Sequence, residues 1–236
     1  MNRPVVVDSS LERAQDIVRE ARGGHTPSPC VKTFFDPATF TASHVVRDPR
    51  SSACAIIDSV LDFDMPSGRT STDSAAALVQ YIHDEGLQVQ WLLETHAHAD
   101  HLSAAPWLQR RVGGTLAIGE HITGVQDTFG KVFNAGKEFK RDGSQFDHLF
   151  ADGAEFTVGN LQATALHVPG HTPACMAYVI GDAVFPGDTL FMPDYGTARA
   201  DFHRGHPCAL HRPQLRALAD PGPDRGRAAL ALKRRG

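Results

Sequence analysis

The sequence predicts an α/β fold in which two packed sheets are flanked by helices, and three observations lead to it. Short β-rich runs occur in both halves of the chain, helical patterns lie between them, and polar residues gather where apolar runs end. The chain has 236 residues, of which 42% are hydrophobic and 21% charged. This is enough for one sizeable domain with a buried core.

The first segment, residues 1–30, is interpreted as an N-terminal appendage without assigned chemistry. Ser9 and Glu12 have the spacing of a capping box, and the apolar residues after them recur at helical intervals. The glycines and prolines of residues 23–29 end this short helix.

Three β-rich runs follow at residues 31–35, 43–46 and 54–57, and the turn residues between them indicate a meander. Asp58 ends the third run, where it is read as a turn residue in preference to a partner of a metal ligand. A helix is expected from the Ser/Thr cluster at 70–74 to Gly86.

The next elements alternate in the same way. We expect a strand at 89–93, a helix over about 102–112 and a strand at 115–118, and we expect His121 and His148 to be exposed. Short strands then return, with glycine turns between them, at 155–158, 161–168, 176–180 and 183–185.

The stretch from Glu94 to His101 reads Glu-Thr-His-Ala-His-Ala-Asp-His and follows a buried strand directly. Side chains two apart in an extended loop point the same way, so His96 and His98 can meet one ion. Asp100 and His101 are expected at the start of the next helix. Burying this many polar groups without a shared partner would be costly, so the cluster predicts a metal site.

Two later turns provide further ligands. His171 follows a strand within Pro-Gly-His-Thr, and Asp188 follows another within Gly-Asp-Thr-Leu. Either turn alone would be ordinary. With the first cluster they supply the third imidazole and the carboxylate that a metal site needs.

Composition argues against several classes of protein. Cys30, Cys54, Cys175 and Cys208 lie far apart without the spacing of a disulfide framework or zinc ribbon, which favours a reducing, cytoplasmic setting. No signal peptide or bilayer-spanning run is recognised, so no membrane association is expected. The net charge is −4 and the body of the chain is acidic, which gives no support for nucleic-acid binding.

The motifs at 96–101, 169–172 and 187–188 stand in the order found in the metallo-β-lactamase superfamily, which residues 31–202 resemble. This resemblance implies an αββα sandwich. Within the superfamily, Glu94–Ala105 and the segment Gly-Thr-Ala-Arg-Ala-Asp-Phe at 196–202 are similar to the persulfide dioxygenases, also called sulfur dioxygenases. Glyoxalase II enzymes usually have Gly-Gly where this chain has Ser103-Ala104.

The resemblance implies one Fe(II) per chain, bound by His96, His171 and Asp188. His98, Asp100 and His101 would then support these ligands or belong to a second metal site. The implied reaction oxidises glutathione persulfide with O₂ to sulfite and glutathione. Zinc could not support it, because zinc has no accessible redox change.

Two further residues receive roles from the resemblance. Arg199 would hold the glutathione, against the alternative of a salt bridge to Asp201 or another neighbour, and Thr172 would donate a hydrogen bond near the metal, against a turn role. Two alternative functions stay open: a zinc-dependent thioester hydrolase similar to glyoxalase II, and an inactive chain that binds metal without turnover. The oligomeric state is also open, with a homodimer as one option.

The resemblance stops at residue 202. Residues 203–236 form an atypical basic tail, with eight Lys and Arg against two Asp, where the family has its last strand and helix and a His-Asp-Tyr-like segment. We therefore expect the sandwich to lack these last elements and to be poorly stable. The abrupt change suggests an out-of-frame translation of a GC-rich gene. Resequencing around codon 202 tests this, and the hypothesis fails if no single-base shift restores the family ending.

Overall fold

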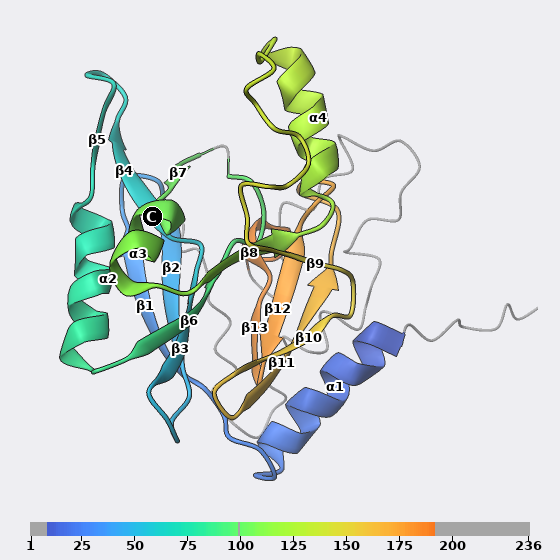
Figure 1. The fold of residues 1–236 in the computed structure, drawn as a ribbon. Coiled ribbons are helices and arrows are strands. Elements are labelled where there is room, and N and C mark those ends of the chain that lie inside the picture. Colours follow the sequence, from blue (N-terminus) through green and yellow to red (C-terminus); the bar gives the residue numbers. More distant parts are fainter. Residues whose placement is uncertain (1–8, 99, 192–236) are drawn as a thin grey trace, which may run out of the picture.

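The computed structural model describes residues 9–98 and 100–191. They form two sheets packed face to face, with helices on both outer faces (Figure 1). The αββα sandwich implied by the resemblance is thereby confirmed for these residues. The expected loss of the last strand and helix concerns residues 203–236, which lie outside the described residues.

The first sheet has six strands in the order β1-β2-β3-β6-β8-β9. Strands β1 to β3 are the predicted antiparallel meander, and β6, β8 and β9 continue the sheet in parallel. Its strands are β1 (Cys30–Asp36), β2 (Thr41–Arg47), β3 (Ala53–Ile57), β6 (Gln88–Leu93), β8 (Thr115–Gly119) and β9 (His148–Phe150). The carboxyl ends of β3, β6 and β8 therefore meet at one edge.

The second sheet is antiparallel throughout, because each of its strands pairs with the next one along the chain. Its strands are β10 (Glu155–Val158), β11 (Leu161–His167), β12 (Met176–Ile180) and β13 (Ala183–Phe185). All four were predicted within one residue. The 3-10 helix Gly187–Thr189 follows β13 and carries Asp188.

A small third sheet was not predicted. It has the order β5-β4-β7, with β4 (Val60–Asp64), β5 (Arg69–Ser71) and β7 (Leu102–Ser103). All three residues of β5 are exposed, so no hydrophobic alternation marked it in the sequence. Because β7 begins at Leu102, the helix expected over 102–112 is shorter: α3 covers Ala105–Val112.

One apolar layer lies on the outer face of the first sheet, and a second lies between the two sheets. Helix α2 (Asp73–Asp84) buries the predicted stripe of Ala75, Leu78 and Ile82 with α3 against the outer face of the first sheet. The core between the sheets includes Ile57, Leu93 and Phe150 from one side, and Leu161, Tyr178 and Phe185 from the other. Helix α4 (Ile122–Val132) projects beyond the sandwich (Figure 1).

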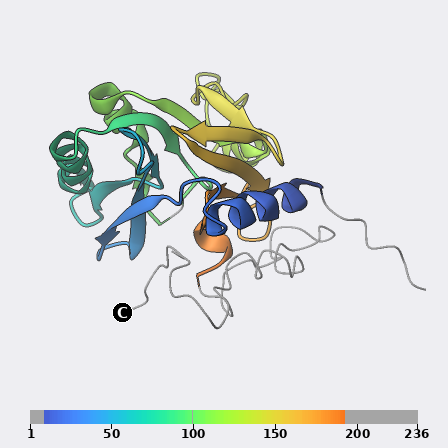
Figure 2. The same cartoon turned by 90° about the horizontal axis from the view of Figure 1, so that it is seen from below.

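Helix α1 (Ser9–Arg22) lies within the segment interpreted as an appendage, yet it covers the second sheet (Figure 2). Its predicted apolar positions Leu11, Ala14, Ile17 and Val18 pack on residues of β11, β12 and β13. Arg13 adds an ion pair of 2.9 Å to Glu155 of β10. This helix is therefore the fourth layer of the sandwich, a role that its sequence pattern alone did not assign.

The described residues contain no helix that is both long and apolar enough to cross a bilayer.

Candidate metal centre

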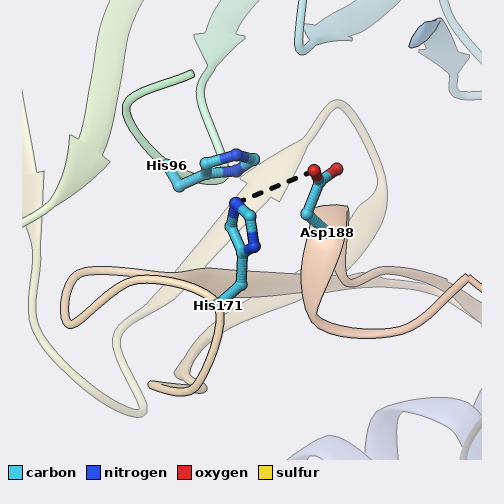
Figure 3. A group of neighbouring side chains, drawn as sticks. All are labelled: His96, His171 and Asp188. Carbon is cyan, nitrogen blue, oxygen red and sulfur yellow. Dashed lines mark ion pairs between the residues drawn. The ribbon is translucent and has the colours of Figure 1, made fainter. Parts of the chain in front are cut away.

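His96, His171 and Asp188 come from three separate segments and meet at one edge of the sandwich (Figure 3). His96 follows β6, His171 lies in the turn between β11 and β12, and Asp188 follows β13. One ligand atom from each of the three lies within 4.8 Å of the other two. The structure thus brings together the three residues that the sequence predicted as metal ligands.

The three side chains differ in exposure. His96 is 1% exposed, whereas the side chains of His171 and Asp188 retain 29% and 18%. The rings of His96 and His171 are nearly perpendicular at 82°, with centroids 4.9 Å apart. His171 Nε2 lies 3.7 Å from Asp188 Oδ2 (Figure 3). The site is therefore closed on the His96 side and more accessible beside the other two ligands.

Gly187 allows the Asp188 turn to lie against the first histidine motif. Its φ is +54°, which favours glycine, and a Cβ at this position would collide with Thr95 Oγ1. Asp58 also has a positive φ, +50°, although it carries a side chain. Such conformations in non-glycine residues are uncommon and gather at functional sites.

His98 lies between two buried carboxylates. Its Nε2 is 3.2 Å from Asp58 Oδ1 and 3.1 Å from Glu94 Oε2. The Glu94 carboxylate also accepts a hydrogen bond from Ser103 Oγ. Asp58 was read in the sequence as a turn residue, and the structure shows that its side chain in addition supports the histidine motif.

The charges of this group shift the pKa values of its members in opposite directions. Burial alone would lower the pKa of His98, but Asp58 and Glu94 outweigh burial and raise it to about 10. Burial alone would raise the pKa of Asp58, but His98 and the Thr95 backbone N–H hold it well below its usual range. Without a metal, therefore, the two carboxylates favour the protonated, positively charged form of His98.

The pKa of His96, a candidate metal ligand, shifts in the opposite direction to that of His98. Burial, with a smaller effect of the charge on His98, keeps the pKa of His96 well below its ordinary value. His96 is thus a neutral imidazole at physiological pH, which is the form that binds metals.

His98, Asp100 and His101 form a second group whose ligand atoms also lie within 4.8 Å of one another. The rings of His98 and His101 stack at 4.1 Å and 30°. Asp100 and His101 were expected at the start of a helix, which is wrong: they lie in the loop before β7, and α3 begins at Ala105. The loop arises because Leu102 and Ser103 pair with β4 instead of entering a helix.

The donor atoms of the first group fit a metal ion. The Nε2 atom of His96 is buried and makes no hydrogen bond within the described part of the chain, and the same holds for His101 Nε2 of the second group. A buried polar atom without a partner is costly, and a metal ion would satisfy it. Two imidazoles and one carboxylate suit Fe(II) as well as Zn(II), so the donor set does not separate these metals.

Of the two residues predicted to contact substrate or metal, the structure describes Thr172 but not Arg199. Thr172 lies in the turn that carries His171, where its backbone N–H and its hydroxyl both lie 3.1 Å from Cys175 Sγ. These contacts stabilise the turn. Arg199 lies outside the described residues, and its binding role remains a prediction.

Sequence reasoning did not single out Glu94, Thr95 and Ser103 as parts of the centre. A signal was available, because Glu94 and Thr95 follow an apolar strand without a break. Polar residues at the end of a buried strand need hydrogen-bond partners. Their partners, however, come from β7 and from the end of β3, and pairing over such separations is invisible in one sequence.

A cavity of about 280 Å³ adjoins the histidine motif. Its lining includes His96, His98 and His101 together with the apolar side chains of Leu116, Ile118 and Phe146. A small, largely apolar ligand group therefore has room beside His96.

Comparison with known proteins identifies related chains. The family model described as the metallo-beta-lactamase superfamily matches residues 36–225. A probable metallo-hydrolase of Burkholderia pseudomallei is 55% identical over 201 residues, which cover 81% of this chain and 68% of the relative. Glyoxylase B2 of Dictyostelium discoideum is 47% identical, with 74% of this chain and 61% of the relative covered.

More distant similarity reaches a persulfide dioxygenase. The human mitochondrial persulfide dioxygenase ETHE1 is 26% identical over 78% of this chain and 61% of its own length. Bacterial relatives from Agrobacterium fabrum and Xylella fastidiosa, named beta-lactamase hydrolase-like proteins, are much more similar, at 50 to 51% identity, but they are longer, and the chain spans only 41 to 42% of their length. The crystal structure of ETHE1 from Myxococcus xanthus has the same fold, with a TM-score of 0.53, 23% identity and coverage of 72% of this chain and 64% of that one.

Proposed function

Because the chain belongs to the metallo-beta-lactamase superfamily, we propose that it is a metal-dependent enzyme whose metal is held by His96, His171 and Asp188. The specific reaction we propose is oxidation of glutathione persulfide by O₂ and water, which yields sulfite and glutathione. The convergence of two histidines and one carboxylate is the observation that carries the metal-dependent role, and the distant persulfide dioxygenases support the choice of reaction. This donor set leaves coordination positions open and is typical of non-haem iron oxygenases.

The metal would supply a redox change and open positions for sulfur and O₂. The chain's own residues hold the ligands and shape their surroundings. His96 is excluded from water, and the partly exposed His171 and Asp188 leave an approach for substrate. The overall reaction balances as persulfide plus O₂ plus water giving thiol plus sulfurous acid.

The rest of the substrate needs a binding group, for which we propose Arg199. Its guanidinium would form a charge-assisted hydrogen bond to a carboxylate of glutathione. The distant persulfide dioxygenases support this choice of substrate.

A second candidate function is zinc-dependent hydrolysis of a glutathione thioester. The more similar relatives carry names of the hydrolase and glyoxylase type, and these names support the second candidate better than the first. The group of His98, Asp100 and His101 would provide the ligands of a second metal in such an enzyme.

Metal analysis and two activity assays separate the candidates. The purified chain is analysed for iron and zinc, then assayed for O₂ uptake with glutathione persulfide and for cleavage of S-lactoylglutathione. One iron per chain and O₂ uptake that depends on persulfide are expected. Two zinc ions with thioester cleavage would establish the second candidate instead, and metal binding without either activity would identify an inactive chain.

A matched pair of variants ties the activity to the centre. Asp188→Ala should abolish whichever activity is found, because it removes the carboxylate ligand. Asp182→Ala, in the turn between β12 and β13, should leave that activity unchanged. Equal activity of the two variants would remove Asp188 from the proposed site.

A further inference from the structure

We propose that the Thr95 hydroxyl, held by Asp58, fixes His96 in the tautomer that presents Nε2 to the metal. Thr95 would then be a positioning residue of the centre. The inference rests on the metal role of His96 in the proposed function, but it holds for iron and zinc alike.

The hydroxyl of Thr95 has two close neighbours. Its Oγ1 lies 2.8 Å from Asp58 Oδ2 and 2.9 Å from His96 Nδ1. A hydroxyl has one hydrogen, and a carboxylate can only accept. The hydrogen of Thr95 therefore goes to Asp58. The contact with His96 is then a hydrogen bond only if Nδ1 of His96 carries the proton and donates it to Oγ1.

The tautomer of His96 decides which nitrogen can bind a metal. A neutral imidazole with its hydrogen on Nδ1 has its lone pair on Nε2. This Nε2 is buried and has no hydrogen bond within the described residues, and His96 faces His171 and Asp188 (Figure 3). The hydroxyl thus turns the lone pair of His96 toward the other two ligands.

Thr95 cannot easily leave this position. Its backbone N–H donates to Asp58 Oδ1 at 2.7 Å, and its carbonyl accepts a 2.8 Å hydrogen bond from the Met176 N–H of β12. Gly187 packs so closely on its side chain that a Cβ there would collide with it. Thr95 therefore connects the end of β3 with the segments that carry His171 and Asp188.

Replacing the hydroxyl by a methyl group tests the inference. Thr95→Val keeps the shape of the side chain but leaves Asp58 Oδ2 and His96 Nδ1 without their partner. Loss of such an outer partner typically weakens metal binding by about 10- to 100-fold. Zinc affinity of the metal-free protein, measured by competition with a chromophoric chelator, should fall by this factor in Thr95→Val and recover in Thr95→Ser.

Two results would overturn the inference. One is zinc affinity of Thr95→Val equal to that of the wild type. The other is equal loss in both variants, because Thr95→Ser retains the hydroxyl. Urea unfolding of the metal-free variants shows whether they are folded.

A measurement on the wild type remains decisive if Thr95→Val does not fold. In the zinc-bound protein, ring ¹⁵N spectra of His96 should show a protonated Nδ1 protected from exchange and a metal-bound Nε2. A metal-bound Nδ1, or a protonated Nε2, would contradict the proposed tautomer of His96. These readouts use zinc and no substrate, so absence of persulfide oxidation would count against the proposed function and leave this inference standing.

Discussion

Ser103 Oγ lies 2.6 Å from Glu94 Oε1 and donates a hydrogen bond to it, which joins β7 to the end of β6. The Glu94 carboxylate is almost fully buried, with only 4% of the residue exposed. Among the described residues, Ser103 and His98 are its side-chain partners.

Ser103→Ala should destabilise the metal-free protein. Hydrogen bonds to charged groups contribute about 1.5–3 kcal/mol, and the substitution leaves one oxygen of a buried carboxylate without this donor. We expect a loss of about that size in the free energy of unfolding by urea. Ser67→Ala is the control, because Ser67 is exposed and bonds through its backbone N–H. Equal stability of the two variants would show that the Ser103 bond contributes little.

Asp188→Asn should weaken metal binding and leave the metal-free fold intact. The amide keeps the size of the side chain but lacks the charge that neutralises a divalent cation, so zinc affinity should fall at least about 10-fold. Asp182→Asn serves as the control, since it removes a charge from the turn between β12 and β13. Zinc titrations of both variants make the comparison. Retention of full affinity in Asp188→Asn would exclude this carboxylate as a ligand.

Gly187→Ala should strain the backbone and, in addition, weaken zinc binding at the metal centre. Gly187 and Gly68 both have positive φ, +54° and +66°, so alanine strains either site by about 1 kcal/mol. Only at Gly187 would the new Cβ collide, with Thr95, whereas nothing lies within 4 Å at Gly68. Zinc affinity should therefore drop in Gly187→Ala and stay unchanged in Gly68→Ala. A similar affinity in both would mean that the Asp188 turn adapts freely.

The stability of the fold should depend on pH through His44. Burial lowers the pKa of His44 to about 4, although the charge of Asp58 opposes this shift. The unfolded chain, with an ordinary pKa of about 6.5, binds the proton more readily. The contribution of His44 to stability is therefore complete above about pH 6.5 and is lost as the pH falls toward 4, by at most about 3 kcal/mol.

Urea unfolding from pH 7.5 to 4 measures this effect in the wild type and in His44→Gln. Other buried histidines also titrate, so the difference between the two proteins is the informative quantity, and it should shrink as the pH falls. His83→Gln, at an exposed site, should keep the wild-type dependence. A difference between wild type and His44→Gln that is constant with pH would contradict the assignment.

Most strands and helices of the sandwich were predictable because each has an apolar pattern of its own. The stripe of Ala75, Leu78 and Ile82 marks α2, and short apolar runs mark most strands of both sheets. Helix α4 and strand β9, which lie in and at the end of the polar stretch of residues 119–148, were not predicted. The hairpin of β4 and β5 was missed because β5 buries nothing. The partner of α1 was missed for another reason: a stripe shows that a helix is covered, but not by which sheet.

The metal ligands were predictable from their motifs, whereas the groups that hold them were not. His96, His171 and Asp188 each follow a strand in a recognisable turn. The support of His96 and His98 depends on Asp58, which lies about forty residues earlier in the chain, and on the exact rotation of Thr95. A sequence records that Asp58 ends a strand, but the neighbouring strand in the sheet determines what its carboxylate touches.

Helix α1 also decides where a shortened version of this protein can begin. A fragment starting at residue 31, where the family resemblance begins, would uncover Leu166, Ala177, Val179 and Val184. These residues lie on the outer face of the sheet whose turns carry His171 and Asp188. Any expression clone intended to retain the metal centre should therefore include the N-terminal helix from Ser9 onward.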